Sequence, residues 1–194
     1  MAPLAQKSDE ELLRLLERGN EEAFTTLYGR RQGGVYRFAL QMSGSPQVAE
    51  EVTQEVFLSL IRGGGKFDES QGSLRSWLFG AARNQVLRHL DGGRRYVAIE
   101  ETDEEGGPGV PEPAAPAQAL EDLTHGELVE SVRQAVLSLP PHYREVVVLC
   151  DLQELSYEEA ARSLECALGT VRSRLNRGRA MLVDKLRAYA TSGV

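Results

Sequence analysis

Cysteine and histidine are scarce in this chain. Its 194 residues include two cysteines and three histidines, namely Cys150, Cys166, His89, His125 and His142. No histidine lies at zinc-ligand spacing from a cysteine, and two cysteines do not make a disulfide framework. The sequence therefore predicts neither a metal ion nor a cofactor, and the low cysteine content favours the reducing cytoplasm.

Long apolar runs and catalytic motifs are also missing. No stretch is long and apolar enough to cross a bilayer, and the N-terminus lacks the apolar core of a signal peptide. The nucleophile motif Gly-x-Ser-x-Gly and the zinc motif His-Glu-x-x-His are both absent, and the three glycines at 63–65 do not have the spacing of a phosphate-binding loop. We therefore expect no membrane insertion and no enzymatic activity.

Basic residues are fewer than acidic ones, 22 against 29, which gives a formal net charge of −7. The charge is segregated, however, because residues 100–122 are rich in acids whereas residues 172–187 are basic. Affinity for nucleic acid depends on the local patch and not on the total, so the net charge does not exclude a DNA-binding protein.

Helical signals dominate what is present. Ser8 and Glu11 have the spacing of a capping box, which predicts a helix to about Arg18. Gly29, Gly33 and Gly34 are poor helix formers, so we expect a break or a loose helix between Tyr28 and Val35. The valines at 146–148 have strand propensity, but the predicted helices on either side favour a helix.

The predicted fold is all-α, with two small helical domains. Residues 1–90 form the N-terminal domain and residues 125–194 form the C-terminal domain, which contains a helix-turn-helix. Residues 91–124 are rich in proline, glycine and acids and cannot build a core, so we expect a flexible acidic linker.

The helix-turn-helix prediction rests on the segment SYEEAARSLECALGTVRSRLNRGR. Ser156 and Glu159 form a second capping box, which starts a short helix, and a second periodic run follows the turn. On that second helix Val171 and Leu175 share an apolar face, and Arg177 lies on the opposite side. A helix of this kind suits the DNA major groove, where arginine bonds guanine edges and asparagine pairs with adenine. The alternative is a basic amphipathic helix with a solvated face.

Two helices of the N-terminal domain carry one-sided charge. Residues 48–60 have a valine and leucine stripe with acids mostly off it, which fits either a docking face or a solvated acidic face. Residues 74–90 place Trp77 near a basic side, and Phe67 precedes them. Aromatic side chains beside positive charge are how single-stranded DNA is held, although the same face also fits simple solubility.

Two segments resemble a known family. The run LPPHYREVVVLCDLQELSYEEAARSLECALGTVRSRLNRGRAML is similar to the promoter-reading C-terminal domain of extracytoplasmic-function (ECF) sigma factors. The run SPQVAEEVTQEVFLSLIRGGGKFDESQGSLRSWLFGAARNQVLRHL resembles their N-terminal conserved domain. The two runs span residues 45–90 and 139–182, one in each predicted domain and in the order of the family. Ala167 stands where the family often has proline.

The resemblance implies three sets of site residues. Recognition of the −35 promoter element would use Thr170, Arg172, Ser173, Arg174, Asn176, Arg177 and Arg179. Recognition and melting of the −10 element would use Lys66, Phe67, Arg75, Trp77, Arg83, Asn84 and Arg88. Binding of polymerase would use Glu50, Glu51, Gln54, Glu55 and Leu58.

The resemblance also implies partners. These are core RNA polymerase, promoter DNA and an inhibitory anti-sigma factor that masks the two domains. The acidic linker would thread the polymerase, either mimicking nucleic acid or acting as a passive tether. Two other functions stay open, a stand-alone helix-turn-helix regulator that binds an operator as a dimer, and a protein-interaction adaptor whose arginines meet an acidic partner.

Overall fold

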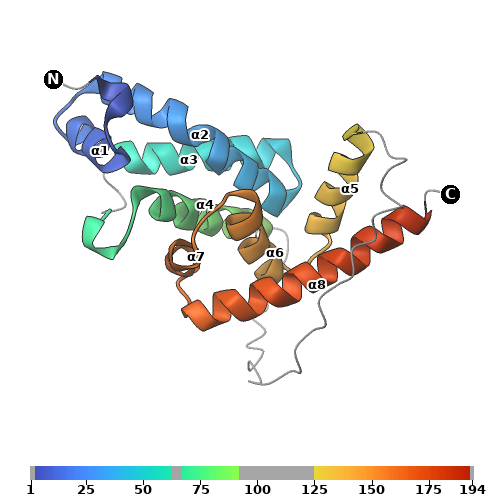
Figure 1. Ribbon diagram of the computed structural model, residues 1–194. Helices are drawn as coiled ribbons and strands as arrows, with labels where there is room; N and C mark the ends of the chain where they lie inside the picture. The colour runs from blue at the N-terminus through green and yellow to red at the C-terminus, as the bar shows by residue number, and fades with distance from the viewer. Residues whose placement is uncertain (1–2, 63–66, 92–124, 193–194) are drawn as a thin grey trace.

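The chain is helical wherever its structure is described. The computed structural model describes residues 3–62, 67–91 and 125–192, and no strand occurs within these ranges (Figure 1). This confirms the all-α fold class for the described residues, whereas the predicted linker lies outside them apart from Asp91. None of the described helices is apolar over a length that would span a membrane.

The N-terminal half contains four α-helices. They are α1 (Asp9–Glu17), α2 (Glu21–Ser43), α3 (Pro46–Ile61) and α4 (Leu74–Asp91). Two short 3₁₀ turns accompany them, η1 (Leu4–Gln6) and η2 (Glu69–Gln71). Helices α2 and α3 lie side by side, and α4 packs against both (Figure 1).

The C-terminal half contains α5 (His125–Leu137), α6 (Pro141–Val147), α7 (Tyr157–Leu164) and α8 (Leu168–Ser192). Helix α6 continues into a π-helical turn, η3 (Val148–Leu152). The three valines at 146–148 are therefore helical and buried, which confirms the helix and excludes the strand. The long helix α8 runs along the lower edge of the molecule and packs against α5, α6 and α7 (Figure 1).

Both predicted capping boxes are present. The Ser8 hydroxyl accepts from the Glu11 N–H at 3.2 Å, and the Ser8 N–H donates to the Glu11 carboxylate at 2.9 Å. Ser156 and Glu159 make the same reciprocal pair at 3.1 and 3.0 Å. Each pair satisfies two backbone N–H donors that a helix start would otherwise leave without a partner, so these helix starts follow from local sequence alone.

The predicted break in α2 is wrong. The helix is continuous from Glu21 to Ser43, through all three glycines. Leu27, Val35 and Phe38 are fully buried on its inner face, and a Cβ at Gly34 would lie 3.7 Å from the ring of Phe79 in α4. Tertiary packing of the buried face outweighs the low helix propensity of glycine here.

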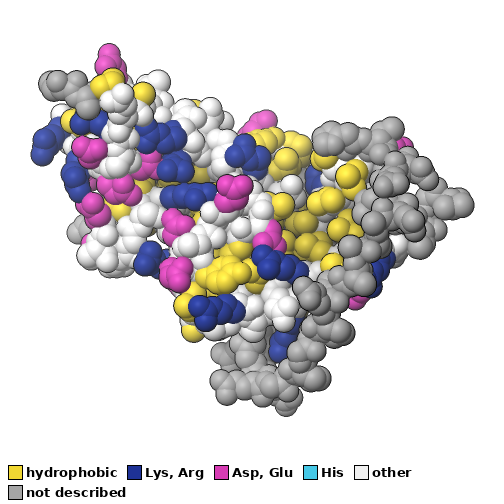
Figure 2. Space-filling model, viewed as in Figure 1, with side chains coloured by type: hydrophobic (Ala, Val, Ile, Leu, Met, Phe, Trp, Pro, Cys, Tyr) yellow, Lys and Arg dark blue, Asp and Glu magenta, His cyan; other side chains and the backbone are white. Residues whose placement is uncertain are grey.

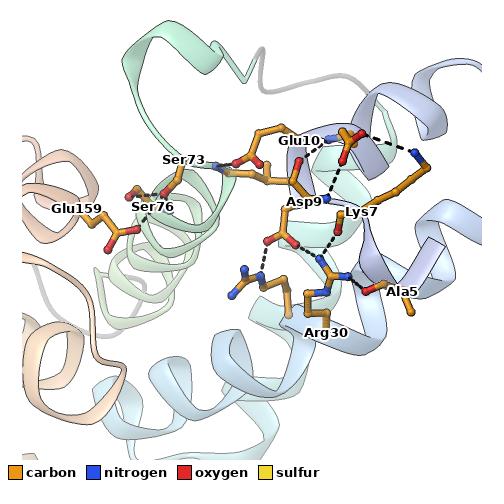
Figure 3. A network of polar contacts seen from close by, with 12 residues as sticks. Ala5, Lys7, Asp9, Glu10, Arg30, Ser73, Ser76 and Glu159 are labelled. Atoms are coloured by element: carbon orange, nitrogen blue, oxygen red, sulfur yellow. Dashed lines mark hydrogen bonds and ion pairs between the residues drawn. The ribbon is translucent and has the colours of Figure 1, made fainter. Parts of the chain in front are cut away.

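A buried carboxylate fastens the start of α1 to α2 (Figure 3). Asp9 is 5% exposed and accepts hydrogen bonds from Arg30, at 2.7 Å, and from Arg31. Arg30 also donates to the carbonyls of Ala5 and Lys7, at 3.0 and 2.9 Å. One carboxylate therefore holds two guanidinium groups and, through Arg30, the segment that precedes α1.

Asp9→Asn is expected to lower the free energy of unfolding by about 2 kcal/mol. Removing the charge leaves Arg30 and Arg31 without their anion, and the usual cost of breaking a buried pair is reduced here because both arginines are about a third exposed. Urea unfolding followed by circular dichroism measures the change. Asp184→Asn, in an exposed pair with Arg187, is the matched control and should not shift the midpoint. Equal midpoints for the two variants would contradict the assignment.

The two halves share one hydrophobic core. Its buried residues come from α1 to α4 and also from α5 to α8, including Leu78 of α4 and Leu164 of α7. Helix α4 packs directly on α7, and α2 contacts both α5 and α6. In this arrangement the helix-turn-helix lies against the helix that carries the predicted −10 residues (Figure 1).

Candidate nucleic-acid interface

The turn between α7 and α8 is held by backbone hydrogen bonds. Glu165 adopts the left-handed conformation, with φ of 52°, and ends α7. The Cys166 N–H donates to the Ala161 carbonyl at 3.0 Å, and the Val171 N–H donates to the Ala167 carbonyl at 3.2 Å. The turn is thus ordered although the sequence has Ala167 and not proline.

Helix α8 is positioned by its apolar face. Val171 and Leu175 are 0% and 2% exposed. At Gly178 a Cβ would lie 2.8 Å from Val147 Cγ2 and 3.4 Å from the Tyr143 carbonyl oxygen, so only glycine permits this approach of α6 and α8. The close contact fixes how α8 is rotated and therefore which side chains face outward.

The outward face of α8 carries the predicted −35 residues. Four of them are exposed, Arg172, Asn176, Arg177 and Arg179, and three are half-buried, Thr170, Ser173 and Arg174. The structure thus places the seven residues on one helix with the basic side directed away from the core, as the periodicity predicts.

Arg179 is braced by an ion pair. Its Nη2 donates to Asp151 Oδ1 at 2.6 Å and its Nε donates to Oδ2 at 3.0 Å. This hydrogen bonding raises the pKa of Arg179, whose guanidinium is charged at physiological pH in any case. Because Asp151 belongs to η3, the pair ties the recognition helix to the π-helical turn.

Four of the predicted −10 residues meet at one cavity. Phe67, Trp77, Asn84 and Arg88 line a cavity of about 590 Å³ between α3, the segment before α4, and α4 itself. A volume of about 300–1,000 Å³ is typical of ligand sites. The cavity combines two aromatic side chains, an amide and a guanidinium, which are the groups that hold unstacked bases and their phosphates.

The other three predicted −10 residues are not at this cavity. Arg75 donates to the carbonyls of Gln153 and Glu154. Arg83 forms an ion pair with Glu145. Both arginines therefore contact the C-terminal half, and Lys66 lies outside the described residues.

Some cavity residues escaped the sequence analysis. Ser59, Gln71 and Gln85 line the cavity, as do residues of α7. Gln85 could have been found from the sequence, because it follows Trp77 by eight residues and Ala81 by four and so belongs to the same helix face. The residues of α7 carry no such signal, because nothing in the sequence shows that α7 lies against α4.

The predicted polymerase-binding residues form a separate surface on α3. Glu50, Glu51, Gln54 and Glu55 are exposed, and Leu58 is 37% exposed. Ile61, 50% exposed, extends the apolar part of this surface. An acidic face with exposed apolar side chains at one end fits a docking surface, and it also fits a solvated helix.

The two cysteines are free thiols. Burial raises the pKa of Cys166, and it raises the pKa of Cys150 to about 11. Both thiols are therefore neutral at physiological pH, as expected of core and turn residues without a nucleophilic role.

Comparison with known families decides what this arrangement belongs to. The family model "Sigma-70 region 2" matches residues 27–96, and "Sigma-70, region 4" matches residues 129–182. The ECF RNA polymerase sigma factor SigM of Mycobacterium tuberculosis is 33% identical to this chain. The alignment is 196 positions long, gaps included, and covers 97% of this chain and 89% of the relative. The chain belongs to the ECF sigma factors. Sigma factors are transcription initiation factors and not enzymes. The function that the resemblance implies and the expected lack of enzymatic activity are therefore both confirmed, and a stand-alone regulator is not favoured.

This sigma factor also resembles a second sequence relative and a solved structure. It is 36% identical over 157 residues to the ECF RNA polymerase sigma factor SigE of Mycolicibacterium smegmatis, covering 81% of this chain and 59% of that relative. Its fold matches that of the sigma factor RpoE from Bartonella quintana, solved in complex with the anti-sigma factor NepR. The TM-score is 0.62 at 24% identity, covering 84% of this sigma factor and 96% of that chain.

Proposed function

We propose that this sigma factor binds core RNA polymerase in the cytoplasm and directs it to promoters through three separate surfaces. The observation that carries the proposal is their separation. A basic recognition helix lies in the region 4 match, whereas the aromatic side chains of the cavity and the acidic docking helix lie in the region 2 match.

Helix α8 reads the −35 element. The close contact at Gly178 fixes the rotation of α8 about its axis. The exposed Arg172, Asn176 and Arg177 therefore enter the major groove together. Arginine and asparagine supply base contacts, and the remaining arginines hold phosphates. Arg179, held by Asp151, is best placed for a fixed phosphate contact at the end of the reading segment.

The cavity takes an unpaired base of the −10 element. Flipping a base out of the stack costs a few kcal/mol, which stacking on an aromatic ring and contact with positive charge offset. Trp77 and Phe67 supply the rings, Arg88 supplies the charge, and Asn84 supplies hydrogen bonds to a base edge. Arg75 and Arg83 join this surface only when they are released from the C-terminal half.

The acidic face of α3 docks on the polymerase. Glu50, Glu51, Gln54 and Glu55 offer charge to a basic partner surface, and Leu58 offers apolar contact. An anti-sigma factor is a second proposed partner, because the solved sigma factor with this fold was captured with one.

Reconstituted transcription tests the proposed function. Core polymerase is incubated with genomic DNA fragments, with and without the chain, and the 5′ ends of the transcripts are sequenced. New start sites that share −35 and −10 motifs are expected only when the chain is present. Start sites that do not change on adding the chain would reject the proposal.

A further inference from the structure

One wall of the proposed −10 cavity is formed by the segment that leads into α4. The structure describes this segment over residues 67–73, and the only regular structure in that range is the short turn η2. Phe67, Asp68, Gln71 and Gly72 line the cavity. A loop of this kind binds a ligand well only when a rigid scaffold positions it, so its contacts with neighbouring helices bear on function.

Glu10 of α1 holds the end of this segment (Figure 3). Its Oε1 accepts a hydrogen bond from the Leu74 N–H at 3.1 Å, at a partly buried site. Leu74 is the first residue of α4, so its N–H has no acceptor within the helix. A carboxylate at a helix N-terminus also interacts favourably with the helix dipole. The start of α4 is therefore fixed by a side chain that lies 64 residues earlier in the chain.

Arg14 holds the middle of the segment. It forms an ion pair with Glu69 of η2, and the two side chains are 53% and 55% exposed. Because the pair is exposed, it is weaker than a buried pair and is sensitive to salt. Glu10 and Arg14 are four residues apart in α1 and share one face of that helix. Helix α1 therefore contacts the segment at two points, its middle and its end.

Within the segment, Asp68 connects these contacts to the cavity. Its Oδ1 accepts from the Ser70 N–H at 2.9 Å and from the Ser70 hydroxyl at 2.7 Å. Its Oδ2 accepts from the side-chain amide of Gln71 at 2.9 Å. Since Ser70 and Gln71 follow Glu69 directly, the position of η2 sets where the Gln71 amide lies on the cavity wall.

The contacts from α1 are internal to the N-terminal half. Glu10 and Arg14 hold residues of η2 and of the start of α4, which belong to the same half. The segment also meets α7, where the Glu159 carboxylate accepts from the Ser73 hydroxyl at 3.2 Å. That contact requires a particular placement of α7, whereas the contacts from α1 do not. The hold of α1 on the segment is therefore a property of the N-terminal half itself.

We propose that Glu10 and Arg14 are positioning residues for the −10 site, because they hold residues 67–73 in the shape that binds the unpaired base. The inference rests on the proposed function of the cavity. Neither side chain is among the described residues that line the cavity, so each acts through the segment and not by touching DNA. When these contacts are lost, the segment samples other shapes, and affinity for the strand falls in proportion to the fraction that keeps the binding shape.

Reversing the ion pair separates positioning from a general effect of charge. Figure 2 shows acidic and basic side chains interspersed over the N-terminal half, so removing one charge changes the surroundings of several others. Arg14→Glu and Glu69→Arg each break the pair, whereas the double variant restores it in the opposite sense at the parent net charge. Arg18→Glu is the matched control, because Arg18 is exposed one turn further along the chain and its side chain has no ion pair within the described residues.

Glu10 is tested by a conservative and a disruptive change. Glu10→Gln keeps a side-chain oxygen that accepts from the Leu74 N–H, whereas Glu10→Ala removes the acceptor and leaves the first N–H of α4 without a partner. Rescue by glutamine therefore distinguishes the hydrogen bond from the charge.

Three measurements are made on each full-length variant. Permanganate reactivity of unpaired thymines gives the rate of promoter opening by holoenzyme on a promoter mapped by transcript sequencing. The same rate on promoters that carry each of the four bases at the unpaired position gives the base preference. Titration with core polymerase gives the affinity for the enzyme. Loss of stability alone would reduce the amount of active holoenzyme without changing the base preference.

Glu10→Ala should slow opening about tenfold and Arg14→Glu about fivefold, within the usual range of coupling between sites and smaller for the exposed pair. Both variants should weaken the base preference and keep the parent affinity for core polymerase. Glu10→Gln and the reversed pair should return to within about threefold of the parent rate, and Arg18→Glu should match the parent chain.

The positioning role is overturned if Glu10→Ala and Arg14→Glu keep the parent rate and base preference. It is also overturned if they slow opening with an unchanged base preference, or if neither Glu10→Gln nor the reversed pair restores the rate. Trp77→Ala is carried through the same assay. Slow opening by Trp77→Ala alone rejects positioning and leaves the proposed function standing, whereas a parent rate for Trp77→Ala rejects the −10 cavity and the inference with it.

Discussion

Replacing Trp77 with alanine is expected to slow promoter opening by the polymerase holoenzyme about 10- to 100-fold. Trp77 is half-buried and lines the cavity together with Phe67, Asn84 and Arg88. Removing an aromatic stacking platform costs about 1–3 kcal/mol per base, which corresponds to this range of rates. Permanganate reactivity of unpaired thymines, followed over time on a promoter mapped by transcript sequencing, measures the opening.

Two controls isolate the stacking contribution. Trp77→Phe keeps an aromatic face and should stay within about threefold of the parent rate, since every ring offers a stacking surface. Affinity of the Trp77→Ala variant for core polymerase should not change, because the docking face on α3 is a different surface. If Trp77→Ala opened the promoter at the parent rate while remaining folded, the cavity would not be the strand site.

Capping boxes and helical periodicity allowed several elements to be predicted from the sequence. Both capping boxes, at Ser8 and Ser156, form as predicted because all their partners lie within three residues. The orientation of α8 was equally predictable, since Val171 and Leu175 recur at helical spacing and their burial leaves Arg177 outside. These features depend on neighbours along the chain and require no knowledge of the fold.

Features that depend on distant residues were not predictable. The continuous α2 depends on burial of its inner face, including Leu27, Val35 and Phe38, in the shared core, and no local propensity shows that burial. Arg83 was placed with the DNA-contacting residues because it is basic and lies on the right helix. Its partner Glu145 is 62 residues away, and a single sequence does not show that pairing.

The basic residues of α4 do not all face the cavity, because Arg75 and Arg83 contact the C-terminal half. One face of this helix lines the cavity, through Trp77 and Arg88, and another meets the C-terminal half. In this structure Arg75 and Arg83 are therefore engaged by the C-terminal half, whereas Trp77 and Arg88 line the cavity.

The Arg172→Ala, Arg177→Ala double variant is expected to weaken holoenzyme binding at the −35 element and to flatten its salt dependence. Each arginine–phosphate contact contributes about 0.9 to the slope of log K against log salt concentration, so loss of two contacts should reduce the slope by about 1.8. An arginine that reads guanine instead contributes about 1–3 kcal/mol of discrimination, and its loss relaxes sequence preference with little change in slope.

Filter binding over a salt series, with −35 duplexes that differ at single positions, separates these two outcomes. Arg187→Ala removes one cation from the same helix beyond the reading segment and should leave both slope and preference unchanged. Because Gly178 and the buried face of α8 fix the direction of Arg172, the effect of the double variant should be confined to DNA binding, with the midpoint of urea unfolding unchanged. A double variant that kept the parent slope and the parent sequence preference would remove α8 from the major groove.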